Sequence, residues 1–190
     1  MINYPFKKKP TLTYNNTANR GMGLEEIINE TNTYYLDHEI AVIYKKPIPI
    51  QITKVDYPDR DHAKIIEAFY KIPSTTDYNG IYNGKYIDFE AKETHNKTSF
   101  PLKNIHAHQI DHLVRCKKHG GISFVIIALV QSNEYYLIDI DCIYEYYVAK
   151  ELSRKSIPLD VIREKGHLIK ESYPIRLDYL SVVKEIYFKN

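Results

Sequence analysis

The sequence has no tryptophan and only two cysteines, Cys116 and Cys142, among its 190 residues. The cysteines have neither CxxC spacing nor the number needed for a disulfide framework, so we expect reduced thiols and a cytoplasmic protein. No apolar run approaches the roughly 20 residues of a membrane-spanning helix. The longest, residues 122–130, is interrupted by Ser123. No apolar segment follows the first lysines, so we expect neither a signal peptide nor a membrane partner.

The chain also lacks a strong excess of either charge. Its 26 basic and 24 acidic residues leave a formal net charge of +2, which alone does not indicate a nucleic-acid partner. Basic residues are instead clustered locally, at Lys7, Lys8 and Lys9, within a polar segment. We therefore expect residues 1–20 to form a flexible basic arm and residues 21–190 to form a single domain.

Tyrosine is abundant where tryptophan is missing, with 18 residues in the chain. Because a tyrosine ring is apolar and its tip is polar, it suits wet interfaces and nucleic-acid contacts. A coding bias toward AT-rich codons explains the same count equally well.

The order of the elements predicts an α/β domain with a mixed central sheet flanked by helices. Asn83-Gly84 supplies the positive φ of a tight hairpin turn, and Gly120-Gly121 ends a helix. Strands are predicted over residues 40–44, 85–93, 122–130 and 134–140. Helices are predicted over residues 24–33, 102–119, 142–152, 158–164 and 177–188.

A segment of about 25 residues, 47–72, interrupts this order. Pro47 and Pro49 open it, and residues 50–55 alternate as a strand does, whereas residues 63–69 fit a short helix or a strand equally well. We interpret the segment as a protruding insertion.

The strongest chemical signal is the strand that carries Glu90 and Lys92. Side chains alternate along a strand, so Ile87, Phe89 and Ala91 share one face, and Asp88, Glu90 and Lys92 share the other. Solvent-exposed strands often carry Glu and Lys without any function. Here the strand is expected to be central. Asp77 and its neighbouring hydroxyls precede it, and Gln109 lies on the apolar face of the next helix. Two carboxylates beside an ammonium suit Mg²⁺-assisted phosphodiester hydrolysis.

Three histidines, His106, His108 and His112, lie within seven residues. The last two are four apart on a helix, a spacing that can bind zinc. No HExxH motif and no further ligand cluster accompanies them, so histidines at a surface or near phosphates are the preferred interpretation.

Several long strings closely resemble the RecU family of Holliday-junction resolvases. The resemblance covers nearly the whole chain from Arg20 onward and includes Lys45-Lys46-Pro47 near the start of the insertion. Its most specific strings are Pro73-Ser74-Thr75-Thr76-Asp77-Tyr78-Asn79-Gly80, Tyr86-Ile87-Asp88-Phe89-Glu90-Ala91-Lys92-Glu93-Thr94, Lys97-Thr98-Ser99-Phe100-Pro101-Leu102 and Asn104-Ile105-His106-x-His108-Gln109.

The resemblance implies a restriction-endonuclease-like fold, a homodimer, and Mg²⁺-dependent symmetric cutting of four-way junction DNA, with Mn²⁺ as a possible substitute. It assigns Thr75, Asp77, Glu90 and Gln109 to a metal site, and Lys92 to transition-state stabilisation. The insertion corresponds to a stalk that engages the junction centre. Recombinase and branch-migration proteins are possible partners. Expected DNA contacts are Lys7, Lys8, Lys9, Arg20, Tyr57 and Tyr70.

Two other functions fit parts of the same pattern. A nuclease of this fold could cut ordinary duplex, although a duplex cutter has no need of a central protrusion. A non-catalytic junction-binding protein could keep the fold alone, but it has no reason to gather Asp77, Glu90 and Lys92.

Overall fold

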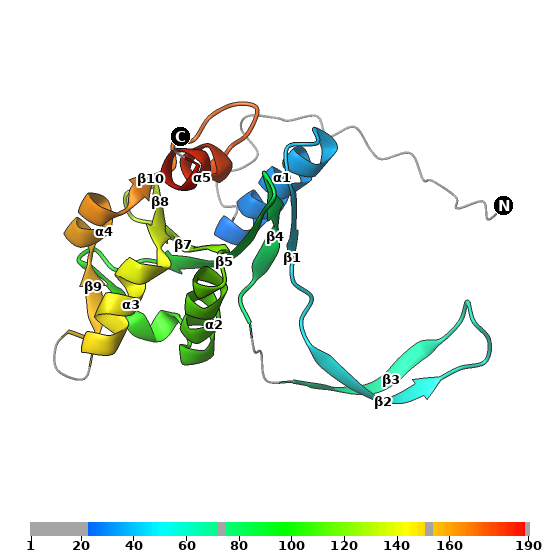
Figure 1. Cartoon of the computed structure of the whole chain (residues 1–190). Helices are drawn as coiled ribbons and strands as arrows, with labels where there is room; N and C mark the ends of the chain where they lie inside the picture. Colours follow the sequence, from blue (N-terminus) through cyan, green and yellow to red (C-terminus); the bar gives the residue numbers. More distant parts are fainter. Residues whose placement is uncertain (1–22, 72–74, 151–153, 189–190) are drawn as a thin grey trace.

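The computed structural model describes residues 23–71, 75–150 and 154–188, and its centre is a mixed six-stranded sheet (Figure 1). Strands β5 and β7 run parallel, whereas the other neighbouring pairs in this sheet are antiparallel. The predicted α/β architecture is therefore confirmed. In spatial order the strands are β1 (Val42–Lys45), β4 (Tyr78–Tyr82), β5 (Lys85–Thr94), β7 (Ile122–Leu129), β8 (Glu134–Asp139) and β10 (His167–Leu168).

Helices pack on both faces of the sheet. Helices α1 (Leu24–Asp37) and α5 (Tyr179–Tyr187) enclose one apolar core with the inner residues of β5. The second core, on the other face, includes residues of α2 (Ala107–Lys118), α3 (Ile140–Ala149) and α4 (Leu159–Lys165). Because β7 contributes to both cores, all eight of its residues are buried.

Strand β5 alternates as predicted. Its apolar residues Ile87, Phe89 and Ala91 belong to the core beneath α1 and α5. The Phe89 ring is stacked between the rings of Tyr78 and Phe124, with centroid distances of 4.8 and 4.9 Å. This packing holds the apolar face of β5 in place and leaves its polar residues on the opposite face, which α2 approaches.

The predicted hairpin turn is confirmed between β4 and β5. Asn83 and Gly84 have φ values of 46° and 74°, the two positive angles that a type I′ turn requires. The register follows from this two-residue turn, and Tyr78 lies opposite Phe89.

The predicted helix over residues 102–119 is wrong in its first part. Residues Leu102–Asn104 form a short 3₁₀ turn, Ile105 is extended, and α2 begins only at Ala107. The cause is a small sheet that the sequence did not reveal, in which β6 (Ser99–Pro101) pairs with β9 (Ser156–Pro158). The backbone N–H of Leu102 donates to Lys155 at 3.1 Å and continues this pairing.

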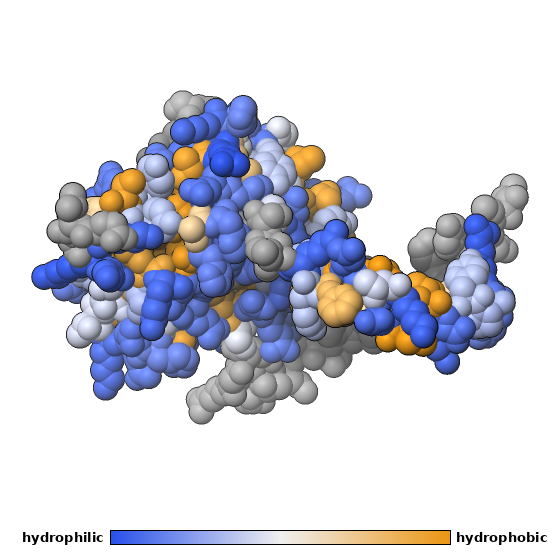
Figure 2. All heavy atoms as spheres, turned by 90° about the horizontal axis from the view of Figure 1, so that it is seen from below, coloured by the Kyte–Doolittle hydropathy of each residue, from blue (hydrophilic) through white to orange (hydrophobic). Residues whose placement is uncertain are grey.

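Strands β2 (Ile50–Asp56) and β3 (Lys64–Tyr70) form a separate antiparallel hairpin, so the undecided segment 63–69 is largely strand. We call residues 50–70 the stalk. It projects away from the main sheet, and every residue of its two strands is exposed (Figure 1). Its exposed hydrophobic side chains include Ile52 and Phe69. Figure 2 shows hydrophobic surface along the stalk. Among the described helices, none has the length and apolar character to cross a membrane.

Candidate active site

Asp77, Glu90 and Lys92 come together at the polar face of β5. Glu90 is fully buried and forms an ion pair with the Lys92 ammonium. Asp77 precedes β4, and its backbone N–H donates to Glu90 Oε2 at 3.1 Å. Lys92 Nζ also lies 3.9 Å from Asp77 Oδ2. The side chains of Asp77 and Lys92 are 31% and 22% exposed, so solvent reaches the site from their side.

The electrostatics of this site favour an added cation. Burial raises the pKa of Glu90 to about 8, and the neighbouring Asp77 carboxyl raises it as well, whereas Lys92 opposes the shift. One ammonium therefore does not fully compensate two converging carboxylates. Carboxylate oxygens are the ligands that Mg²⁺ prefers, so the donor set fits a hard divalent cation.

The structure gives the other two predicted metal ligands different surroundings. Thr75 is half-buried in the segment that leads into Asp77. Gln109 is buried on α2, and its Oε1 accepts the backbone N–H of His106 at 2.9 Å. That contact closes the first turn of α2, a role the sequence did not suggest. Ligation of a metal by Thr75 and Gln109 stays a prediction.

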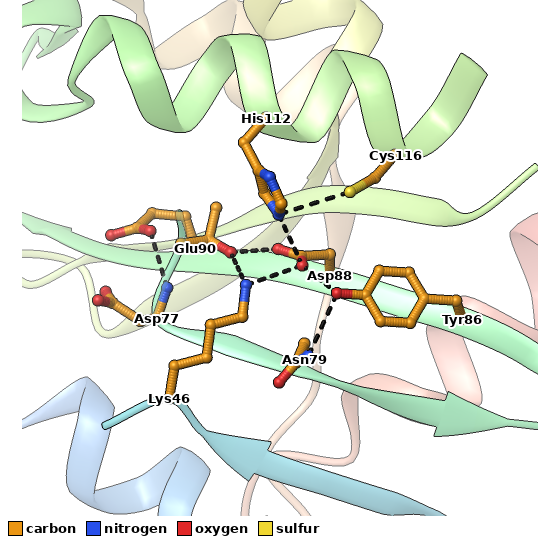
Figure 3. A network of polar contacts seen from close by, with 9 residues as sticks. Lys46, Asp77, Asn79, Tyr86, Asp88, Glu90, His112 and Cys116 are labelled. Atoms are coloured by element: carbon orange, nitrogen blue, oxygen red, sulfur yellow. Dashed lines mark hydrogen bonds and ion pairs between the residues drawn. The ribbon is translucent and has the colours of Figure 1, made fainter. Parts of the chain in front are cut away.

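Sequence reasoning missed a second polar cluster, centred on Asp88 (Figure 3). Asp88 is fully buried, and four side chains contact its carboxylate. Lys46 Nζ, the Tyr86 hydroxyl and His112 Nε2 lie 2.8, 2.7 and 2.9 Å from Oδ2, and the Thr76 hydroxyl donates to Oδ1. The strand alternation already placed Asp88 beside Glu90 and Lys92, and that signal could have drawn attention to it.

The histidines separate into different environments. His106 caps α2, and its ring stacks on that of His108 at 5.5 Å. His112 instead faces Asp88, and its Nε2 lies 3.5 Å from Cys116 Sγ. Asp88, His112 and Cys116 place possible ligand atoms within 4.8 Å of one another. The Lys46 ammonium also pairs with the Asp88 carboxylate, so the group is part of a salt-bridged cluster.

The structure describes two of the six residues that are predicted to contact DNA. Tyr57 and Tyr70 lie at the stalk with 62% and 83% of their surface exposed. Lys7, Lys8, Lys9 and Arg20 lie outside the described residues.

Asp77 lies beside Glu90 and Lys92, which project from the polar face of β5, and this arrangement of two carboxylates and a lysine is compatible with a metal-dependent nuclease. The family model described as Recombination protein U matches residues 19–185. A protein named Holliday junction resolvase RecU from Geobacillus sp. strain WCH70 is 55% identical over 176 residues, covering 92% of this chain and 88% of that protein. The chain therefore belongs to the RecU family.

A second relative is also similar in sequence, whereas a solved structure resembles this chain only weakly. A protein of the same name from Bacillus cereus strain G9842 is 52% identical over 183 residues, covering 96% of this chain and 91% of its own length. The structure of the Archaeoglobus fulgidus Holliday junction resolvase Hjc is 11% identical and gives a TM-score of 0.44. The match covers 77% of this chain and 97% of that chain.

Proposed function

We propose that this protein is a Mg²⁺-dependent endonuclease that resolves four-way (Holliday) junction DNA by paired, symmetric strand cleavage in recombination and repair. The observation that carries the proposal is the convergence of Asp77, just before β4, with Glu90 and Lys92 on the polar face of β5 in a RecU-family chain. Holliday junction resolvase is the name of the relatives that are 52 to 55% identical to it.

In this proposal Asp77 and Glu90 hold the cation, with Thr75 and with Gln109 either directly or through water. Mg²⁺, or Mn²⁺ in its place, would lower the pKa of a water molecule and neutralise part of the phosphate charge. The two carboxylates would determine where the cation is held, and therefore where the negative charge of the phosphate is balanced. Lys92, which lies beside both carboxylates, places a compact positive charge where the phosphate gains negative charge in the transition state.

Selectivity for junctions would come from shape. The stalk is long, exposed and rich in apolar and aromatic side chains, so it can occupy the open crossover that a linear duplex lacks. A homodimer with two equivalent sites would match the near two-fold symmetry of a junction and give paired cuts. We place this activity in the cytoplasm, where Cys116 and Cys142 would stay reduced.

The decisive experiment incubates the full chain with a synthetic four-way junction, each strand labelled in turn, and with a linear duplex of the same sequence. We expect cuts at symmetry-related positions of two opposing strands with Mg²⁺, none with a chelator, and none with Asp77→Asn. Equal cutting of the duplex would identify a duplex nuclease instead. Tight junction binding without any cut in Mg²⁺ or Mn²⁺ would identify a non-catalytic binding protein.

A further inference from the structure

The segment that carries Asp77 must be held in place by contacts with other parts of the chain. It follows the stalk directly and reaches the sheet only at Tyr78, the first residue of β4. Residues 72–74 lie outside the described part of the chain. Asp77 must nevertheless meet Glu90 at a fixed distance, because two carboxylates bind one ion only in a defined geometry.

Lys46 contacts this segment at two points. Its backbone N–H donates to the Asp77 carbonyl oxygen at 2.7 Å, one residue beyond the last β1–β4 pair. Its ammonium donates to the Thr76 hydroxyl at 2.8 Å. One residue of the chain therefore holds the main chain of Asp77 and the side chain of its neighbour.

The Lys46 ammonium is itself anchored to β5, the strand that carries Glu90. Lys46 Nζ lies 2.8 Å from Asp88 Oδ2, and the Thr76 hydroxyl donates to Asp88 Oδ1. The Lys46 side chain is 16% exposed and Asp88 is fully buried, so little water competes with this pair. A buried carboxylate is stable only when it is paired and fully hydrogen-bonded, which opposes any drift of the cluster.

The cluster spans separate elements. Tyr86 on β5 and His112 on α2 complete the contacts of Asp88 Oδ2 (Figure 3). Asp88 is two residues from Glu90 on the same strand face. The triad of Lys46, Thr76 and Asp88 therefore links the Asp77 segment to the strand that carries the other metal-binding carboxylate.

We propose that Lys46 is a positioning residue for the metal site. Lys46 holds Asp77 against Glu90 through Thr76 and Asp88. The inference rests on the proposed metal-dependent cleavage. Lys46 needs no contact with DNA or with the ion for this role. Its removal should weaken metal binding while leaving the chemical step almost intact once the site is filled.

The test measures Mn²⁺ binding to the DNA-free full chain by electron paramagnetic resonance. We expect Lys46→Met and Thr76→Val to raise the dissociation constant roughly 10- to 100-fold, the range typical of groups that orient metal ligands. Thr76→Ser keeps the hydroxyl and should bind as the wild type does. Lys117→Met is the control, because Lys117 also pairs with two carboxylates, Asp139 and Asp141, in a more exposed position.

A second readout separates positioning from general damage. For Lys46→Met, the Mn²⁺ concentration that gives half-maximal junction cleavage should rise by the same factor as the dissociation constant, and the rate at saturating Mn²⁺ should approach the wild-type rate. If Lys46→Met does not fold, the Thr76→Val and Thr76→Ser pair decides alone.

The inference is overturned if Lys46→Met and Thr76→Val bind Mn²⁺ like the wild type, or if Lys117→Met loses as much affinity as they do. A loss of saturated rate with unchanged binding would also overturn it. Failure of the proposed function looks different, because then the wild-type chain would bind no Mn²⁺ or Asp77→Ala would bind it normally.

Discussion

Asp77 and Glu90 are thirteen residues apart in the sequence, yet the backbone N–H of Asp77 donates to the Glu90 carboxylate at 3.1 Å. The two-residue turn at Asn83-Gly84 sets this relationship, because it fixes the register in which Tyr78 lies opposite Phe89. Asp77 precedes Tyr78 and Glu90 follows Phe89, so the two carboxylates lie next to that pair. A short turn therefore brings the proposed metal ligands together, and a change of register by one residue would turn Glu90 into the core.

We predict that Asp77→Ala or Glu90→Ala abolishes junction cleavage, whereas junction binding survives or becomes tighter. Each substitution removes a proposed metal ligand, and Asp77→Ala also removes a carboxylate whose charge would repel phosphate. Cleavage of a labelled junction in Mg²⁺ and a binding titration in a chelator measure the two effects separately. Glu26→Ala, at an exposed glutamate of α1, is the control and should cut normally. Wild-type cleavage by either site variant would contradict the assignment.

Lys92→Ala should lower the cleavage rate by orders of magnitude while the junction dissociation constant changes little. A charge that acts on the developing transition state contributes to the rate and not to ground-state binding. Single-turnover rates at saturating Mg²⁺, together with a binding titration, give both values. If affinity fell sharply and turnover stayed the same, Lys92 would be a phosphate anchor.

The raised pKa of Glu90 predicts how the metal-free protein responds to pH. Because the pKa is about 8 in the folded state and lower when the chain is unfolded, the folded state takes up a proton more readily. Stability from this group is therefore lost as pH rises through about 8. Glu90→Gln cannot titrate, so its melting temperature should exceed that of the wild type most above pH 8. The difference should shrink as pH falls toward 5, and calorimetry in a chelator measures it. A difference independent of pH would contradict the shift.

Alternation and turn chemistry were sufficient to predict that Asp77, Glu90 and Lys92 lie close together, because their positions depend on one hairpin and on one face of β5. The Lys46–Asp88 pair could not be predicted in this way. Lys46 reaches Asp88 only after β1 pairs with β4 across the stalk, and no local period encodes that pairing. The start of α2 was also missed. Leu102 and Ile105 are three residues apart, a spacing that a 3₁₀ turn satisfies as well as an α-helix.

The last prediction concerns the stalk. Removing residues 52–68 and joining Gln51 to Phe69 through Asn-Gly keeps the pairing of Ile50 with Tyr70 and leaves Lys46 and Asp77 untouched. The shortened chain should bind Mn²⁺ like the wild type, because the stalk forms its own sheet outside both cores. Junction affinity should fall far more than duplex affinity, since duplex contacts depend on phosphates and the open crossover depends on an object that fills it.

Single substitutions refine this test. Tyr57→Ala and Tyr70→Ala each remove an exposed ring, and a base stacked on such a ring is stabilised by about 1–3 kcal/mol. Each should therefore weaken junction binding roughly 5- to 150-fold if its ring stacks on an unpaired base. Parallel titrations with a junction and a linear duplex, after sedimentation shows the same oligomeric state as the wild type, provide the measurement. An equal loss on both substrates would mean that the stalk contacts DNA without distinguishing its shape.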